Sequence, residues 1–259
     1  MRNGPIALPL AVLLFGASAC TPPDSGQPAA AASAPTAAID PTDLTGVWTN
    51  SPPESTRAFQ NWSFSAEPPQ LTAWGRERYD QAKPTFGDRS VPVTDTNDPV
   101  YDCFPPGTPR VYFHPFPMEI THTPGRVLML FEYDHLIRQI YVDGRDHRTD
   151  LAPMWMGDSI GRWEGDTLVV ETVNFNDQTW LDRRGVPHSD QLRVTERIRR
   201  IDADNLQIDI TIEDPIALAE PWIGQRFYSR TDWQIEELVC MDNVNFAEYE
   251  EDLLQYDGE

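Results

Sequence analysis

The densest group of potentially reactive side chains lies at positions 174–190. Two carboxylates, Asp177 and Asp182, precede the imidazole of His188 and the hydroxyl of Ser189. An imidazole can act as a general base, a carboxylate can orient it, and a hydroxyl can act as a nucleophile. The stretch is also a polar connection between two predicted strands, where aspartates make turns and His188 is simply exposed. Both interpretations stay open, because a catalytic triad is a spatial arrangement that adjacency in sequence does not predict.

Glu196 is unusual because period-two alternation places it on the apolar face of its predicted strand, with Val194 and Ile198. A carboxylate in apolar surroundings must be paired or protonated. Three arginines could pair with it across strands: Arg138, Arg197 and Arg199. The alternative is a catalytic acid that burial holds neutral. The predicted catalytic residues are therefore His188, Asp177, Asp182 and Glu196.

Glu132 follows the same reasoning, because alternation gives it a face with Leu128 and Leu130. If Glu132 and Glu196 point into one cavity, repulsion between their charges raises one pKa and poises that carboxyl as an acid. Tryptophans beside polar loops offer flat faces to a sugar or an aromatic ligand, although such rings more often pack in a core or at a rim. Four residues are predicted to contact a ligand: Glu132, Arg138, Trp155 and Trp180.

The five histidines, at positions 114, 122, 135, 147 and 188, show none of the spacings typical of a zinc site. Residues 143–147 have the polar character of a cation loop. They lack the alternating oxygen ligands and the terminal glutamate of a calcium loop, so we interpret them as a turn. The sequence therefore predicts no metal site and no cofactor.

The N-terminus has the organisation of an export signal. An arginine precedes an apolar run at 6–15, and small residues lead from there to Cys20. The run is shorter than the about 20 residues that a membrane-spanning helix needs. Small residues before Cys20 are typical of a bacterial lipoprotein signal, whereas Ala17 and Ala19 also fit ordinary secretory cleavage. We predict a signal peptide at 1–19, lipidation of Cys20 and a periplasmic or outer-membrane location, with a soluble periplasmic protein as the alternative.

Residues 20–40 are rich in proline, alanine, serine and threonine and carry almost no charge. Such a segment cannot bury a core and suits a tether. Residues 41–259 are long enough for a single domain with a sizeable core. The whole chain has 41 acidic residues against 20 lysines and arginines, a net charge of −21 that makes nucleic acid a poor partner. The expected partner is a small molecule, and the membrane is contacted only through the lipid on Cys20.

Cys103 and Cys240 remain once Cys20 carries lipid, and an oxidising compartment favours their pairing. The chain-entropy model values the closure of so long a loop at about 5 kcal/mol. Neither cysteine lies in a Cys-x-x-Cys or Cys-His spacing, which disfavours a redox centre or a metal site. We predict a disulfide between Cys103 and Cys240.

The first half of the mature chain contains few regular elements. A strand is predicted to open at 46–48, and a short helical pattern at 71–82 begins with Thr72 as its cap. Prolines recur at 83–124 too often for regular structure, so we expect an extended loop there. Together with the 174–190 loop, it is expected to rim the mouth of a cavity.

The second half alternates short apolar segments with turn signals, and 206–213 shows the clearest alternation of apolar and polar side chains. Four hairpins are predicted: 127–133 with 136–143, 160–163 with 168–174, 192–201 with 206–213, and 225–230 with 233–240. A terminal amphipathic helix is predicted at 246–256. The fold class is therefore all-β and mainly antiparallel, a barrel or strongly curved β-sandwich of about ten strands with a short helix near each end.

Two resemblances add to this prediction. Gly46-Val47-Trp48 resembles the Gly-x-Trp signature of lipocalins, and the hairpin at 163–168 resembles one common in related lipid-binding barrels of the calycin type. The run from Cys103 to Asp214 is similar to a large group of uncharacterised bacterial exported proteins. A lipocalin-like barrel implies a small apolar ligand in a cup. Some similar barrels are hydratases or isomerases, so the resemblance implies no choice between a binder and an enzyme.

These observations rank three functions. The first is an exported, lipid-anchored barrel whose cavity holds a small apolar or aromatic molecule, with or without carbohydrate character. The second is a cofactor-independent lyase, isomerase or hydrolase that uses His188 with Asp177 or Asp182 and a buried Glu196. The third is a structural envelope protein without a cavity.

Overall fold

The computed structural model describes residue 4 and residues 40–242. Contacts divide the chain into Met1–Ala38 and Ile39–Glu259, and residues 40–242 belong to the second unit. The predicted signal peptide apart from Gly4, almost all of the predicted tether and the predicted helix at 246–256 lie outside the described residues. Within the described part of the chain, no helix has both the length and the apolar character needed to cross a bilayer.

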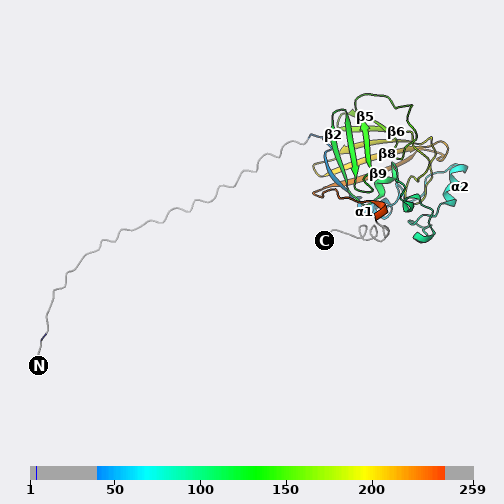
Figure 1. The fold of residues 1–259 in the computed structure, drawn as a ribbon, viewed down its shortest axis with the longest axis horizontal. Coiled ribbons are helices and arrows are strands. Elements are labelled where there is room, and N and C mark those ends of the chain that lie inside the picture. The colour runs from blue at the N-terminus through cyan, green and yellow to red at the C-terminus, as the bar shows by residue number, and fades with distance from the viewer. Residues whose placement is uncertain (1–3, 5–39, 243–259) are drawn as a thin grey trace. The chain divides into compact units, whose positions relative to one another are not determined.

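Nine strands form a closed barrel, in which each strand pairs with the next and β9 returns to pair with β1 (Figure 1). The prediction of an all-β barrel is therefore confirmed. The strands are β1 Gly46–Asn50, β2 Met118–Thr123, β3 Arg126–Phe131, β4 Ile137–Tyr141, β5 Asp158–Glu164, β6 Thr167–Val173, β7 Arg193–Arg200, β8 Asn205–Glu213 and β9 Trp222–Thr231.

Three of the four predicted hairpins are present, as β3–β4, β5–β6 and β7–β8. Their registers place alternate side chains inside the barrel. In β7–β8, for example, Val194 faces Ile212 and Glu196 faces Ile210, and all four side chains are fully buried. Local alternation was sufficient to find these strands because each pairs with its neighbour in sequence.

The fourth hairpin prediction is wrong. Residues 222–231 form the single strand β9, and residues 233–240 form no strand. Because β9 already pairs with β8 and β1, the closed barrel has no edge left to accept a tenth strand. Residues 232–242 instead make isolated contacts outside the barrel ladder, such as the bridge between Leu238 and Tyr133.

The pairing of β4 with β5 also departs from an antiparallel prediction. Ile140 pairs with Ser159 and Tyr141 with Ile160 in parallel register. The chain between these strands, 142–157, is long enough to cross back to the starting end of the barrel, which a tight turn cannot do. The other eight strand pairs are antiparallel.

The region expected to be one extended loop, 83–124, contains the strand β2, so that expectation is wrong at its end. β2 pairs with β1 and β3 and helps to close the barrel. Short 3₁₀ helices occupy part of the rest: η1 Val93–Asp95, η2 Pro99–Asp102 and η3 Arg110–Phe113. The prolines before β2 hid its alternating pattern from sequence reasoning.

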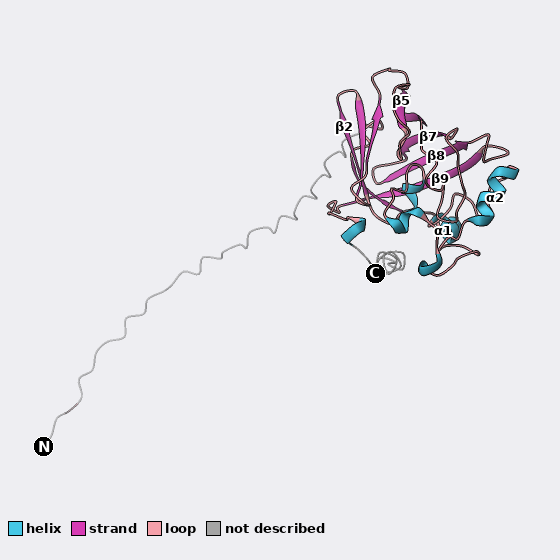
Figure 2. Ribbon diagram, turned by 45° about the vertical axis from the view of Figure 1, so that its right-hand side comes forward, coloured by secondary structure: helices cyan, strands magenta, loops and turns pink. Residues whose placement is uncertain are grey.

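Two α-helices, α1 Glu54–Gln60 and α2 Ala73–Gln81, gather with the 3₁₀ helices on one side of the strands (Figure 2). The helix at 71–82 was predicted, and its cap is confirmed because Thr72 Oγ1 accepts a hydrogen bond from Gly75 N at 3.0 Å. The helix α1 was not predicted. Its seven residues are too few to show a clear helical period.

Cys103 and Cys240 form the predicted disulfide, with their Cα atoms 5.6 Å apart. Cys103 directly follows η2, and Cys240 begins the short 3₁₀ helix η4 Cys240–Asp242. The bond therefore fastens the segment that follows β9 to the loop region before β2.

The barrel interior is filled partly from outside the strands. Tyr112 and Phe113 of η3 belong to the same buried core as the strand side chains. Phe64, from the loop after α1, packs edge-on against Phe113 at 4.5 Å and against Trp222 at 5.3 Å between ring centroids. Gly224 on β9 makes room for it, since an added Cβ would lie 2.5 Å from Phe64. Inserted side chains therefore occupy part of the barrel interior, where a ligand cavity was predicted.

Candidate functional site

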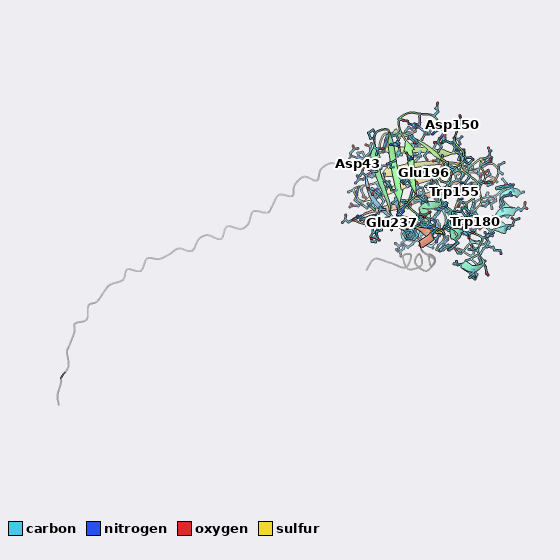
Figure 3. The ribbon with its side chains drawn as sticks, viewed as in Figure 1. Asp43, Asp150, Trp155, Trp180, Glu196 and Glu237 are labelled. Atoms are coloured by element: carbon cyan, nitrogen blue, oxygen red, sulfur yellow. A yellow bond between two sulfur atoms is a disulfide. The ribbon has the colours of Figure 1, made fainter. Side chains whose placement is uncertain are left out.

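Glu196 lies inside the barrel in an ion pair with Arg138 of β4. Arg138 Nη1 donates to Glu196 Oε1 at 3.0 Å, and Arg138 Nη2 donates to Glu196 Oε2. Tyr112 of η3 donates its hydroxyl to Glu196 Oε1 at 2.7 Å. All three side chains are buried, and Figure 3 marks Glu196 within the barrel.

Two hydroxyls complete this group. Arg138 Nε donates to Ser159 Oγ at 3.1 Å, and Arg138 Nη2 donates to Thr172 Oγ1 at 2.8 Å. Burial alone would lower the pKa of Arg138, but the adjacent Glu196 and Tyr112 raise it. Burial raises the pKa of Tyr112 well above its usual range. The geometry therefore supports the ion-paired interpretation of Glu196, with Arg138 as its partner in place of a ligand contact.

The other two candidate arginines face away from the interior. Arg197 and Arg199 are exposed, and Arg197 Nη1 donates to Glu164 Oε2 at 2.9 Å. They alternate with Glu196 along β7, so the pleat of the strand turns them to the opposite face.

Glu132 does not share a cavity with Glu196. The strand β3 ends at Phe131, so strand alternation does not extend to Glu132. Its Oε2 accepts from Trp233 Nε1 at 2.7 Å and from Glu236 N at 3.0 Å. Glu132 thus holds the segment after β9, and the two carboxylates do not form a mutually repelling pair.

Asp182 organises its own loop. Its Oδ1 accepts from Arg184 N at 3.0 Å and from Val186 N at 3.1 Å, while Oδ2 has no hydrogen-bond partner among the described residues. Burial raises the pKa of Asp182 against the lowering effects of Ser63, these two backbone N–H groups and Arg110. The carboxylate therefore shapes a tight turn, as the structural interpretation of this loop expected.

His188 is buried, and its Nδ1 lies 3.1 Å from the carbonyl oxygen of Ser189. A carbonyl can only accept, so Nδ1 carries the hydrogen and the neutral ring keeps its lone pair on Nε2. Burial lowers the pKa of His188, opposed by the Ser189 carbonyl and the charges of Asp214 and Asp177. His188 is therefore held as a neutral imidazole near neutral pH.

The hydroxyl of Ser189 serves a different partner. Ser189 Oγ donates to Asp214 Oδ1 at 2.9 Å, and Ser189 N donates to Asp214 Oδ2 at 2.6 Å. Asp177 is exposed. The four predicted catalytic residues thus occupy distinct environments: a polar barrel core, a turn, a buried ring and a solvent-exposed loop. The structure does not bring them together as one site.

A small pocket lies among the loops beyond the barrel strands. Its cavity volume is about 10 Å³, room for one water molecule. It draws on both loops expected to rim a cavity, six residues from 83–124 and one from 174–190. The lining side chains are Phe86, Asp98, Val100, Tyr101, Arg110, His114 and Arg183.

Arg110 and Asp98 form the charged floor of the pocket. Arg110 Nη1 donates to Asp98 Oδ1 at 2.8 Å, Arg110 Nη2 donates to Asp98 Oδ2, and both side chains are buried. Burial lowers the pKa of Arg110, but the charge and hydrogen bonds of Asp98, together with Tyr133 and Asp182, raise it overall. Arg110 Nε has no hydrogen-bond partner among the described residues.

Aromatic rings surround these charges. The guanidinium of Arg183 lies 3.7 Å from the ring centroid of Phe86, and the ring of His114 lies 3.9 Å from that of Tyr133. Trp180 lies beside the Arg110–Asp98 ion pair, because the Arg110 guanidinium is 5.3 Å from the centroid of its ring. Sequence reasoning missed Arg110, His114 and Asp98, since they come together only when η2 and η3 fold over the barrel.

Trp155 lies apart from the lining of this pocket. Its ring stacks on Phe104, with centroids 5.6 Å apart. Figure 3 labels Trp155 and Trp180 as separate positions. Among residues 40–242, no group of three or more His, Cys, Asp or Glu side chains is arranged to hold a metal ion.

No family model matches the chain, and no curated protein matches it. One similar solved structure is a secretary abundant heat soluble (SAHS) protein from Ramazzottius varieornatus. The identity is 10%, the TM-score is 0.35, and the match covers 73% of this chain and 95% of that one. A likeness at this level carries no argument about ligand or activity. The resemblance to bacterial exported proteins stays a prediction.

The buried ion pair yields the first prediction. Glu196→Gln removes the charge opposite Arg138 and leaves a buried guanidinium uncompensated, so we expect a loss of roughly 3–5 kcal/mol in the free energy of unfolding. Urea denaturation of the native protein and the variant measures this loss in the free energy of unfolding. The matched control is Glu164→Gln, which disrupts exposed ion pairs with Arg162 and Arg197 and should change stability little. Equal losses in the two variants would contradict the role assigned to Glu196.

The second prediction concerns pH. The folded protein holds His188 with a lowered pKa, so the unfolded chain binds the extra proton more readily. The stability linked to His188 is present above the ordinary value of about 6.5 and is lost as the pH falls through the folded pKa. Urea midpoints at about pH 7.5 and about pH 5.5 should therefore differ more in the native protein than in His188→Gln. An unchanged difference in the variant would rule out this linkage.

Proposed function

We propose that this protein is exported, is held at a bacterial membrane by lipid on Cys20, and binds a small molecule in the loop pocket of its barrel domain. The observation that carries the binding proposal is the Nε–H of Arg110, a buried donor that lines the pocket and has no partner among the described residues. Buried donors are almost always satisfied, so this one calls for an acceptor from a bound molecule.

The polar lining selects the kind of group that fits. Asp98 already accepts hydrogen bonds from Arg110 and from Val100 N. Arg110 and Arg183 can only donate. An entering group must therefore accept hydrogen bonds, and a carboxylate or carbonyl does so with the best geometry for a guanidinium.

The apolar lining selects the rest of the molecule. Phe86 and Tyr101 are half-buried at the pocket, and Val100, which also lines it, is buried. The pocket has room for a group the size of one water molecule, such as a single acceptor oxygen, so the larger body of a ligand lies outside it against these rings. We infer a small apolar or aromatic acid or carbonyl compound, bound among the loops and not in the barrel interior.

One observation supports a second function, a cofactor-independent lyase, isomerase or hydrolase. His188 is held with its hydrogen on Nδ1 and with a lowered pKa, which suits a general base, and the charge of Asp177 acts on it. Asp182 and Glu196 have structural hydrogen-bond roles, so this alternative rests on His188 and Asp177.

The binding proposal predicts the behaviour of Arg110→Lys. Lysine keeps a cation opposite Asp98 but lacks the Nε–H in its fixed position. Affinity for a small carboxylate such as benzoate, measured by calorimetry, should fall by about tenfold or more, equivalent to about 1.4 kcal/mol. Arg148→Lys, at an exposed arginine paired with Asp150, is the matched control.

Toluene supplies the ligand control, because it has the ring without an acceptor and should bind far more weakly than benzoate. Equal affinity for benzoate in the native protein and in Arg110→Lys would contradict the proposal that the loop pocket binds a carboxylate. Mass spectrometry and chromatography of the recovered compound separate the two functions, since a changed mass would support a lyase or hydrolase, and an unchanged mass with a new retention time would support an isomerase.

Lipid anchoring predicts a covalent change at Cys20. In cells given radiolabelled palmitate, the native chain should become labelled and sediment with membranes, while Cys20→Ser should remain unlabelled and be released in soluble form. Cys103→Ser, which removes a cysteine that is disulfide-bonded to Cys240, should still become labelled and sediment with membranes. A native chain that is unlabelled and soluble would favour ordinary secretory cleavage.

A further inference from the structure

Phe104 and Trp155 form an aromatic pair at the protein surface, separate from the loop pocket. Their ring centroids lie 5.6 Å apart, and their planes differ by 29°. Phe104 is 45% exposed, and Trp155 is half-buried. Exposed large aromatic side chains that stand together mark binding surfaces more often than isolated ones do.

The backbone around this pair is held in place. Cys103, next to Phe104, is disulfide-bonded to Cys240, and Phe104 N donates to Pro99 O at 3.1 Å. Gly107 lets its loop approach Trp155 closely, since an added Cβ would lie 2.6 Å from Trp155 O, and its φ of +72° also favours glycine. The rings are therefore presented on an ordered surface, which lowers the entropy lost on binding.

Polar side chains belong to the neighbouring segment. Asn176 N donates to Met154 O at 3.0 Å, next to Trp155 in the chain. Gln178 N donates to Asn176 Oδ1 at 3.1 Å, which fixes this turn, and Asp177 and Gln178 are exposed. The turn that carries the exposed Asp177 and Gln178 is therefore hydrogen-bonded to the residue before Trp155, and these two side chains offer donors as well as acceptors.

We propose that Phe104, Trp155, Asp177 and Gln178 form a binding site for a neutral oligosaccharide. A sugar ring has an apolar C–H face that packs on an aromatic ring and hydroxyls at its edge that both donate and accept. Asp177 and Gln178, on the turn bonded to Met154, supply donors and acceptors suited to those edge hydroxyls.

Charge separates this ligand class from the alternatives. The net charge of −21 opposes acidic polysaccharides and nucleic acids, while a neutral glycan has no such repulsion to overcome. A purely apolar partner would leave Asp177 and Gln178 unused. The inference does not rest on the loop pocket, which other residues line.

Isothermal titration with cellotetraose, maltotetraose and N-acetylchitotetraose tests the proposal. We expect the native protein to bind at least one of these glycans. Phe104→Ala should weaken that binding about tenfold or more through loss of stacking, and Asp177→Ala should weaken it while the aromatic pair stays intact. Ile223→Ala, at a side chain 61% exposed on β9, is the matched control and should bind like the native protein.

Arg110→Lys separates this site from the loop pocket, because it should impair carboxylate binding and leave glycan binding unchanged. Circular dichroism confirms that each variant is folded. The proposal is overturned if the native protein binds none of the three glycans at millimolar concentration. It is equally overturned if Phe104→Ala and Asp177→Ala bind as tightly as Ile223→Ala.

Discussion

The ion pair between Arg138 and Glu196 is the interaction on which the rest of the structure depends. It joins β4 to β7 through the barrel interior, and Tyr112 ties the inserted helix η3 to the same carboxylate. A buried ion pair is tolerated only when its remaining donors and lone pairs are satisfied. Ser159 and Thr172 meet that requirement for the guanidinium. Strands and inserted loop therefore form one core.

This constraint places the proposed binding chemistry in the loops. Tyr112 points into the barrel, whereas Arg110, two residues earlier in η3, lines the pocket with His114 just beyond the helix. The same short helix thus fills the interior and builds a site outside it. The backbone of the pocket residues in this helix is held by the core, which preorganises the proposed site.

Local signals explain which elements could be predicted. The three hairpins and the cap at Thr72 depend on residues close in sequence, and the disulfide followed from the compartment and from there being only two other cysteines. The strand β2 and the parallel β4–β5 pair depend on partners chosen when the barrel closes. The pocket around Arg110 was missed for the same reason, since its lining spans residues 86 to 183.

Glu196 shows most clearly which features the sequence determines and which the tertiary structure decides. Period-two alternation by itself determined that its carboxylate would be buried and would need a partner or a proton. Arg197 and Arg199 were nearest in sequence, yet the pleat turns both to the opposite face. Arg138, 58 positions earlier, reaches the carboxylate across the interior. Only the tertiary structure decided that choice, because the closure of the barrel sets which inward-facing side chains meet.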